Sequence, residues 1–291
     1  MAAQNLTRRE MITIMEKYTE AVIQKKPKLL PLAENVRATF NGVECAVGDN
    51  PMWKNTLVMP ERQTFIDTVT GEMVLFGTTN NETVERNFDF PIEEYVYNIR
   101  CHFTARIKLE DGLITQIEEL AADRRQRNFY GAVEDIRLPD LIFEIPIPEE
   151  ERSTREELHD IVAAYWNCIA KKGGDPADPA NLPIHPDAQR FENGYRTTNH
   201  SHSVRGDFTH NKGFYWETPE AERKFPVIDP VRGVVVSYAF LAGQGYVEGG
   251  YRGAYIVEAF KIKDGAISRL YAHFPALKGT TSGWEGYDYA R

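Results

Sequence analysis

A carboxylate and an imidazole near the end of the chain have the spacing that acid–base chemistry needs. Glu258 alternates with Ile256 and Phe260, so it shares the apolar face of a predicted strand. His273 lies in the next predicted strand, beyond a tight turn at Asp264-Gly265. We therefore expect the two side chains to be cross-strand neighbours, with Glu258 orienting His273 as a general base. The alternative is a buried Glu–His pair that only stabilises the sheet.

Three other histidines form a second candidate group. His200, His202 and His210 lie in one polar segment together with Asp207. We predict that they act as catalytic groups or contact a substrate. A loop that only faces solvent is one alternative, and a zinc or iron site is another, because imidazole and carboxylate suit both metals. The segment has no helical His-Glu-x-x-His motif, so no metal is predicted.

Aromatic residues supply the remaining candidates. Tyr195 follows Asn193-Gly194 at a predicted strand end and is assigned to the catalytic group as a phenolic acid. Five residues are predicted to bind a planar aromatic substrate: Tyr165, Trp166, Tyr238, Phe214 and Trp216. Aromatic side chains of this kind also build ordinary cores, which is the alternative for all five.

The elements that must position these residues occur twice in the chain. Segments 37–42 and 189–194 resemble each other, and so do 108–112 and 261–265, where Lys-x-x-Asp-Gly closes a strand. The copies lie about 150 residues apart, far beyond the repeat of a solenoid. The sequence therefore predicts two copies of one fold. They span residues 1–137 and 152–291, with a linker at 138–151 that is rich in proline and acidic residues.

Each copy is predicted to begin with a helix and continue with strands. Thr7 caps the first helix with Glu10 at the capping-box position, and Ser153 or Thr154 caps the second. Apolar residues at helical spacing give each helix one buried stripe. These residues are Met11, Met15, Tyr18 and Val22 in the first helix, and Leu158, Ile161, Val162, Tyr165 and Ile169 in the second. Alternating runs joined by glycine turns follow, so the predicted class is α+β with helices on one face of a curved antiparallel sheet.

This order of elements, the Leu-Pro-Leu step at 30–32 and the Lys-x-x-Asp-Gly turn before the last strand resemble the NTF2-like (SnoaL-like) superfamily in both halves. The resemblance implies two tandem cone-shaped α+β barrels, each a bent sheet around helices with a mostly apolar pocket at its open end. The superfamily includes dehydratases, isomerases, polyketide cyclases, non-catalytic transport factors and a lyase acting on lignin-derived diarylpropanes. Most of its enzymes use no cofactor, so the resemblance implies none here and favours the diarylpropane (lignin-dimer) lyase type.

The two copies differ where chemistry is expected. The first-copy positions that match the face of Glu258 are uncharged, namely Leu109, Ile107, Ala105, Phe103 and Cys101. Counting from the Asp-Gly turns sets His273 against Leu120. His102 is predicted on an outward, solvated face. We therefore predict an active site in the second copy and an apolar lining in the first.

Composition limits the classes of partner. The chain has 291 residues, 42% hydrophobic and 26% charged, with a net charge of −9, which suits two globular domains. The negative charge argues against nucleic-acid and anionic membrane partners. Cys45, Cys101 and Cys168 suggest no disulfide framework, and the N-terminus lacks an apolar signal, so the cytoplasm is predicted. We expect a homo-oligomer or an intramolecular pseudo-dimer.

The sequence thus predicts a cofactor-independent lyase that uses acid–base chemistry on a hydroxylated aromatic small molecule, such as a lignin-derived diarylpropane. The reaction would be dehydration, elimination or C–C cleavage with deformylation. One alternative is a non-catalytic small-molecule-binding or assembly protein. Another is a SnoaL-like isomerase, cyclase or hydrolase.

Overall fold

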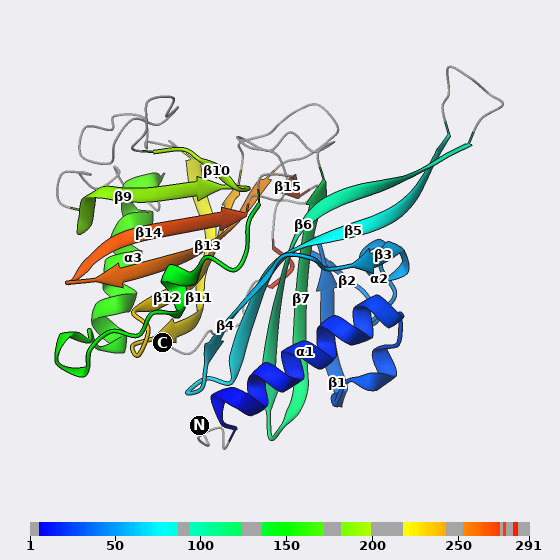
Figure 1. The fold of residues 1–291 in the computed structure, drawn as a ribbon, viewed down its shortest axis with the longest axis horizontal. Coiled ribbons are helices and arrows are strands. Elements are labelled where there is room, and N and C mark those ends of the chain that lie inside the picture. The colour runs from blue at the N-terminus through cyan, green and yellow to red at the C-terminus, as the bar shows by residue number, and fades with distance from the viewer. Residues whose placement is uncertain are drawn as a thin grey trace.

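The computed structural model describes residues 6–86, 94–123, 136–171, 182–198, 218–242, 253–273, 276–277 and 282–284. In these ranges the chain forms two halves, each with a long helix across one face of a β-sheet (Figure 1). The first half contains α1 (Arg8–Gln24), η1 (Pro27–Leu29), β1 (Leu32–Phe40), β2 (Val43–Glu44), α2 (Pro51–Asn55), β3 (Thr56–Val58), β4 (Arg62–Asp67), β5 (Glu72–Arg86), β6 (Glu94–Glu110) and β7 (Leu113–Asp123). The turns η3 (Leu141–Glu144) and η4 (Glu149–Glu151) follow. The second half contains α3 (Arg155–Ile169), β8 (Ala170–Lys171), β9 (Ile184–Glu192), β10 (Tyr195–Arg196), β11 (Thr218–Asp229), β12 (Val234–Ala242), β13 (Gly253–Lys263), β14 (Ala266–His273) and β15 (Ala276–Leu277).

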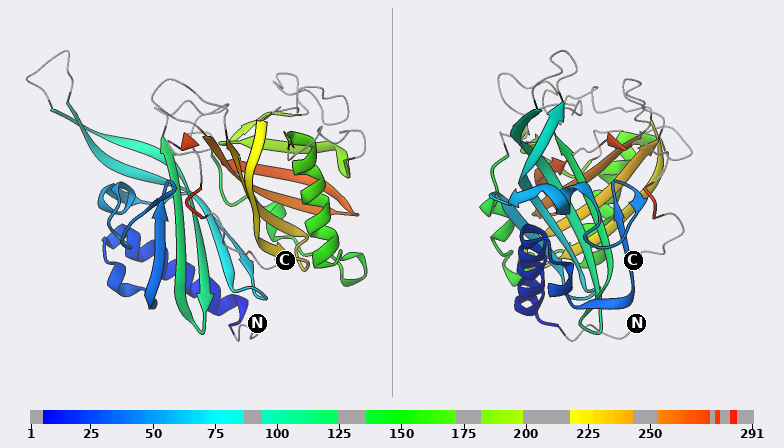
Figure 2. Two further views of the ribbon diagram at one scale, coloured as in Figure 1. Left: turned by 180° about the vertical axis from the view of Figure 1, so that it is seen from behind. Right: turned by 90° about the vertical axis from the view of Figure 1, so that its right-hand side faces the viewer.

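The long helices form as their sequences predict. Thr7 and Glu10 make a reciprocal capping box at the start of α1. Thr154 and Glu157 make the same pair of bonds before α3. The predicted stripes contribute to one buried cluster in each half, and Figure 2 shows α3 lying along the second sheet. The α+β class and the repeated order of elements are therefore confirmed. No helix in the described ranges is long and apolar enough to cross a membrane.

The two sheets share one strand order. Neighbouring strands run β2-β1-β7-β6-β5 in the first sheet and β10-β9-β14-β13-β12-β11 in the second. The long hairpins are antiparallel, but β1 runs parallel to β7 and β9 runs parallel to β14. Each sheet is therefore mixed, with one parallel pair beside the predicted antiparallel hairpins. The two partner strands lie near the beginning and at the end of one half in each case, so no tight turn dictates an antiparallel pairing.

The last hairpin of each half contains a one-residue β-bulge. The pairing register shifts by one residue shortly after each Asp-Gly turn. The extra residue is Thr115 in the first half and Ser268 in the second. Their hydroxyls donate to the carbonyl oxygens of Lys108 and Lys261, at 3.5 Å and 3.1 Å respectively. Because side chains alternate along a strand, one extra residue reverses which face the following residues occupy.

The sheet faces that carry no long helix pack against each other, and we call this contact the inter-sheet interface. Its apolar part combines Phe65, Val74, Phe76 and Leu120 with Val227, Val236, Tyr238, Tyr255, Val257 and Tyr271. His102 (1% exposed) and Lys261 (3%) are buried on these faces. The expectation that the face of His102 is solvated was therefore wrong. Alternation shows which residues share a face, but it does not show that the other half covers that face.

A charged group is buried in the same interface. Glu118 accepts hydrogen bonds from Arg106, at 2.8 Å, and from Lys224, at 2.7 Å, so an ion pair joins the halves. The hydroxyl of Tyr255 also donates to Glu118, at 2.7 Å. Each of these groups is enclosed by protein, so losing one partner would leave a buried charge without compensation.

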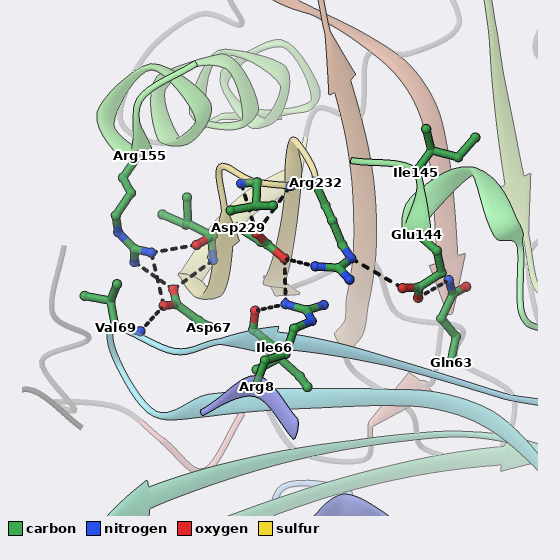
Figure 3. Close-up of polar contacts among 12 residues, drawn as sticks. Arg8, Gln63, Ile66, Asp67, Val69, Glu144, Ile145, Arg155, Asp229 and Arg232 are labelled. Carbon is green, nitrogen blue, oxygen red and sulfur yellow. Dashed lines mark hydrogen bonds and ion pairs between the residues drawn. The ribbon is translucent and has the colours of Figure 1, made fainter. Parts of the chain in front are cut away.

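Two further ion pairs cross between the halves in matching positions (Figure 3). Arg155, the first residue of α3, donates to Asp67 at the end of β4, at 2.7 Å. Arg8, the first residue of α1, donates to Asp229 at the end of β11, also at 2.7 Å. A reciprocal exchange of this kind is what an isologous interface between two copies produces. The two halves are thus arranged as a pseudo-symmetric pair.

Candidate active site

Glu258 lies on the sheet face that packs against α3, which is the face that the sequence predicts. Ile256 and Phe260 of the same strand belong to the buried cluster that includes the α3 stripe. Glu258 itself is 0% exposed. A carboxylate without water needs charged or hydrogen-bonding partners, or it takes up a proton.

Arg190 on β9 supplies the opposite charge. The register sets Glu192, Ala272 and Glu258 side by side across β9, β14 and β13. The small Ala272 side chain separates the two carboxylates, and the Arg190 guanidinium contacts both of them. Its Nη2 lies 2.6 Å from Oε1 of Glu258, and its Nη1 pairs with Glu192. The sequence analysis missed Arg190 and Glu192, although their alternation with Ala188 already placed them on the apolar face.

Tyr165 completes this group from α3. Its hydroxyl donates to Oε1 of Glu258 at 3.3 Å and accepts from Nε of Arg190 at 3.2 Å. The phenol is fully buried, and its pKa is raised by burial, with the charge of Glu258 adding to the shift. Tyr165 therefore acts as a hydrogen-bond donor here. We call Tyr165, Arg190, Glu192 and Glu258 the acid–base cluster.

The two oxygens of Glu258 have different surroundings. Oε1 is held by Arg190 and Tyr165, whereas Oε2 has no hydrogen-bond partner in the part of the chain that the structure describes. Burial raises the pKa of Glu258, and the charge and hydrogen bond of Arg190 and the bond from Tyr165 offset only part of that shift. A carboxylate with a raised pKa and one unengaged oxygen is suited to accept and return a proton.

Two other predicted residues lie near the cluster. Tyr195 on β10 is in register with Glu192, so its side chain lies on the same face. Trp166 is buried beside Tyr165, and its Nε1 donates to the hydroxyl of Ser237 at 2.9 Å. The predicted residues His200, His202, His210, Phe214 and Trp216 lie outside the described residues. The described chain ends before them at Thr198, whose hydroxyl accepts from the backbone N–H of Arg190 at 3.0 Å.

His273 does not pair with Glu258, and this part of the prediction was wrong. Without the bulge at Ser268, counting from the turn would place His273 on the face of Glu258. With it, His273 is opposite Val257 and Glu258 is opposite Ala272. His273 therefore points into the inter-sheet interface. Its ring lies 5.0 Å from that of Phe76 and 4.9 Å from that of His102, measured between centroids.

Tyr238 also lies on the other side of the second sheet. It is opposite Val257 on β13 and belongs to the apolar part of the inter-sheet interface. Its ring packs edge-to-face with Tyr255 at 5.5 Å, and Nζ of Lys224 lies 5.0 Å from its centroid. The expectation that Tyr238 lines the second cone was therefore wrong, because its neighbours belong to the interface and not to the cluster around α3.

The first half holds a buried carboxylate that the sequence analysis missed. Glu119 on β7 faces α1 and is 2% exposed. Its Oε1 accepts from the hydroxyl of Tyr18 and from Nε1 of Trp53, at 2.7 Å in the latter case. Its Oε2 accepts from Nδ2 of Asn50 at 2.7 Å. The expected uniformly apolar lining of the first half was therefore wrong.

The two buried carboxylates belong to equivalent cross-strand pairs of the two halves, but they lie on opposite strands of the hairpin. Ala105 pairs with Glu119 in the first half, and Glu258 pairs with Ala272 in the second. Ala105 and Glu258 lie six residues before the turn aspartate, and Glu119 and Ala272 lie eight after it. Both glutamates bind the tyrosine of their first helix. They differ in their other partners, which are neutral donors in the first half and the Arg190 cation in the second.

Among the described side chains, no group of three or more His, Cys, Asp or Glu residues is placed to hold a metal ion. No disulfide joins Cys45, Cys101 and Cys168 to one another.

One comparison with known families matches part of the chain. A family model described as a domain of unknown function (DUF8021) matches residues 151–274. No curated protein matches the chain.

Each of the following solved structures is similar to about two fifths of this chain. AclR from Streptomyces galilaeus, a “putative hydroxylase”, is 10% identical, with 40% of this chain and 82% of that chain covered and a TM-score of 0.33. A “putative polyketide cyclase” from Silicibacter sp. TM1040 is 16% identical, with coverage of 40% and 93% and a TM-score of 0.31. A “putative SnoaL-like polyketide cyclase” from Jannaschia sp. CCS1 is 7% identical, with coverage of 40% and 90% and a TM-score of 0.31.

Proposed function

We propose that the chain is a cofactor-independent enzyme of acid–base chemistry whose reaction takes place in the second half, with Glu258 as the group that transfers the proton. The observation that carries the proposal is that the two oxygens of this buried carboxylate have different hydrogen-bond surroundings. Oε1 is fixed by Arg190 at 2.6 Å, and Oε2 has no partner among the described residues. A carboxylate with a purely structural role is expected to have both oxygens satisfied, as Glu119 has.

The other members of the cluster have supporting roles in this proposal. Arg190 and Tyr165 orient the carboxylate through Oε1, so that Oε2 faces the substrate. Oε2 removes a proton from a carbon or oxygen acid, and the electron pair moves into the substrate. The protonated Glu258 then returns the proton to another substrate atom or to a leaving group. His200, His202, His210 and Tyr195 remain predicted to assist at the substrate oxygen.

The finer assignment is to a lyase that eliminates water or cleaves a C–C bond in a hydroxylated aromatic compound, such as a lignin-derived diarylpropane. Aromatic substrates suit a site without cofactor because a phenol spreads the charge that develops when the proton leaves. The same cluster would also serve a SnoaL-like isomerase or cyclase, in which the proton returns to carbon. The fate of the substrate anion distinguishes the two.

Proton exchange tests the shared first step without knowledge of the final product. The full chain is incubated in D₂O with a panel of phenolic ketones and diarylpropane diols, and NMR follows deuterium uptake and product formation. Glu258→Gln should lower the rate on any active compound by about 100-fold or more, the size expected for losing a general base. Glu119→Gln is the matched control, since it removes the buried carboxylate from the equivalent cross-strand pair of the first half. This variant should keep the wild-type rate per folded molecule.

The outcomes separate an enzyme from a binding protein. Equal loss of rate in the two variants would show that the loss is not specific to Glu258, which would contradict the proposal. A compound that binds wild type and Glu258→Gln with equal affinity, and that neither exchanges nor reacts, would instead indicate the non-catalytic binding protein. Formation of a cleaved or dehydrated product would favour the lyase, and exchange with double-bond migration or ring closure would favour the isomerase or cyclase.

A further inference from the structure

The tripeptide Ser282-Gly283-Trp284 belongs to the second half of the sequence but binds to the first half of the structure. Trp284 is 1% exposed, and its Nε1 donates to the hydroxyl of Thr39 on β1 at 2.9 Å. The carbonyl oxygen of Gly283 accepts from Nη2 of Arg37, also on β1, at 2.6 Å. Both bonds are made to side chains that face the tripeptide from a single strand.

The indole of Trp284 lies among positive charges. The guanidinium carbons of Arg37 and Arg106 are 4.3 Å and 4.7 Å from the ring centroid. Nζ of Lys224 is 5.7 Å away, which places a cation of the second half beside the same ring. Tryptophan has the strongest cation–π attraction of the natural side chains, and desolvation strengthens it. A smaller or aliphatic side chain would not provide these contacts.

Each position of the tripeptide is recognised by a different property. The Ser282 hydroxyl binds a carboxylate oxygen of Glu222 and accepts from the backbone N–H of Trp284, at 3.1 Å for the latter bond. Gly283 has φ +80°, and a Cβ there would lie 2.5 Å from the carbonyl oxygen of Gly42. The surroundings thus select a hydroxyl, the absence of a side chain, and an indole, in that order.

We propose that the edge of the inter-sheet interface is a peptide-recognition site for the Ser-Gly-Trp sequence, occupied here by the chain's own residues 282–284. The site is composite. Arg37, Thr39 and Arg106 belong to the first half, and Glu222 belongs to the second, so the bound tripeptide ties the halves together in addition to the linker. A separate peptide with the same sequence would bind wherever the chain's own tripeptide has been removed. This proposal is independent of the acid–base cluster.

Full-length chain carrying Trp284→Ala tests the proposal. A synthetic peptide of residues 278–291 is titrated into this variant and into wild type by calorimetry. The peptide should bind the variant at least ten times more tightly than wild type, in which the chain's own tripeptide competes. Bound peptide should also raise the Tm of the variant towards that of wild type, because a ligand that binds only the folded state stabilises it.

Two controls keep the result interpretable. A peptide with Ser282, Gly283 and Trp284 in permuted order has the same composition, and it should bind the variant at least ten times more weakly. Adding Arg37→Met to the variant removes the hydrogen bond to the carbonyl oxygen of Gly283 and the cation–π contact with the indole. It should weaken binding of the peptide by a similar factor. If Trp284→Ala does not fold, Gly283→Ala is the variant that vacates the site. Equal binding to wild type and variant, or no binding to a folded variant, would overturn the proposal.

Discussion

Replacing His273 by leucine should stabilise the protein, and more so in acid than at neutral pH. His273 is 0% exposed, and neither ring nitrogen has a partner at hydrogen-bond geometry among the described residues. The first half has Leu120 at the matching position, buried in the same apolar cluster. An unsatisfied polar group in such surroundings costs about 1–3 kcal/mol. His273→Leu should therefore raise the free energy of unfolding by about that amount at pH 7.

The pH dependence follows from the ionisation of the imidazole. Burial, and next to it the neighbouring His102, hold the pKa of His273 well below its usual range, and the backbone of Phe103 opposes this only in part. The native state therefore stays neutral in mild acid, whereas the unfolded chain takes up a proton below about pH 6.5. Because the unfolded state binds more protons, stability falls as the pH falls. At pH 5 this costs about 2 kcal/mol, against about 0.2 kcal/mol at pH 7.

Urea unfolding of wild type and His273→Leu at pH 7 and pH 5 measures both effects. The gain in stability on substitution should be about 2 kcal/mol larger at pH 5 than at pH 7. His159→Gln on α3, where the histidine side chain is 28% exposed, is the control for replacing a histidine that is not fully buried. A gain that is the same at both pH values would mean that His273 is protonated in the native state, and the reasoning from its burial would fail.

Four further substitutions test other parts of the structure by urea unfolding. Glu119→Ala should cost about 3 kcal/mol or more, because it leaves three buried donors without an acceptor, and a loss below about 1 kcal/mol would mean that water replaces the carboxylate. Asp67→Ala should cost about 3–5 kcal/mol, since Asp67 is 1% exposed. Asp229→Ala should cost less because the Asp229 side chain is itself more exposed, at 9%; the reverse order would contradict this. Arg190→Met should lower the free energy of unfolding by about 3 kcal/mol at pH 7, because it leaves the buried Glu258 carboxylate without its counter-charge. The loss should be smaller at pH 5, because the pKa of Glu258 is raised and a protonated Glu258 needs no counter-charge. A loss of stability that grows in acid would show that the charge of Glu258 is not its cause.

Local patterns predicted the helices and the face of Glu258 because both depend on residues close in sequence. The capping box at Thr7 and the alternation around Glu258 involve neighbours within a few positions. The face of His273 depends on the bulge at Ser268, which is an ordinary residue for a strand and gives no local sign of an extra position. The Arg190–Glu258 contact joins two residues that are 68 positions apart, on strands that both pair with β14. The periodicity of apolar residues does not predict which distant strands pair.

The buried outer faces were missed for a related reason. Arg106 and Glu118 alternate with apolar residues, as solvated side chains do, and only the second half shows that they are covered. In a duplicated fold, a sheet face with alternating charged residues can be buried, because two copies with matching faces can cover each other. The charges that one sheet would otherwise expose to water then find partners in the other, such as Lys224.

The two halves together identify which buried carboxylate is suited to chemistry. Both cross-strand pairs place one glutamate and one alanine against the helix, so the position of the carboxylate is common to the scaffold. Glu119 receives only neutral donors on both oxygens, and such a group is rigid and fully satisfied. Glu258 has a cation on one oxygen and no partner within the described residues on the other, an arrangement that stabilises the fold less than full satisfaction would. Proteins tolerate that cost mainly where a group must exchange a proton, which is why the second half is the place to look for turnover.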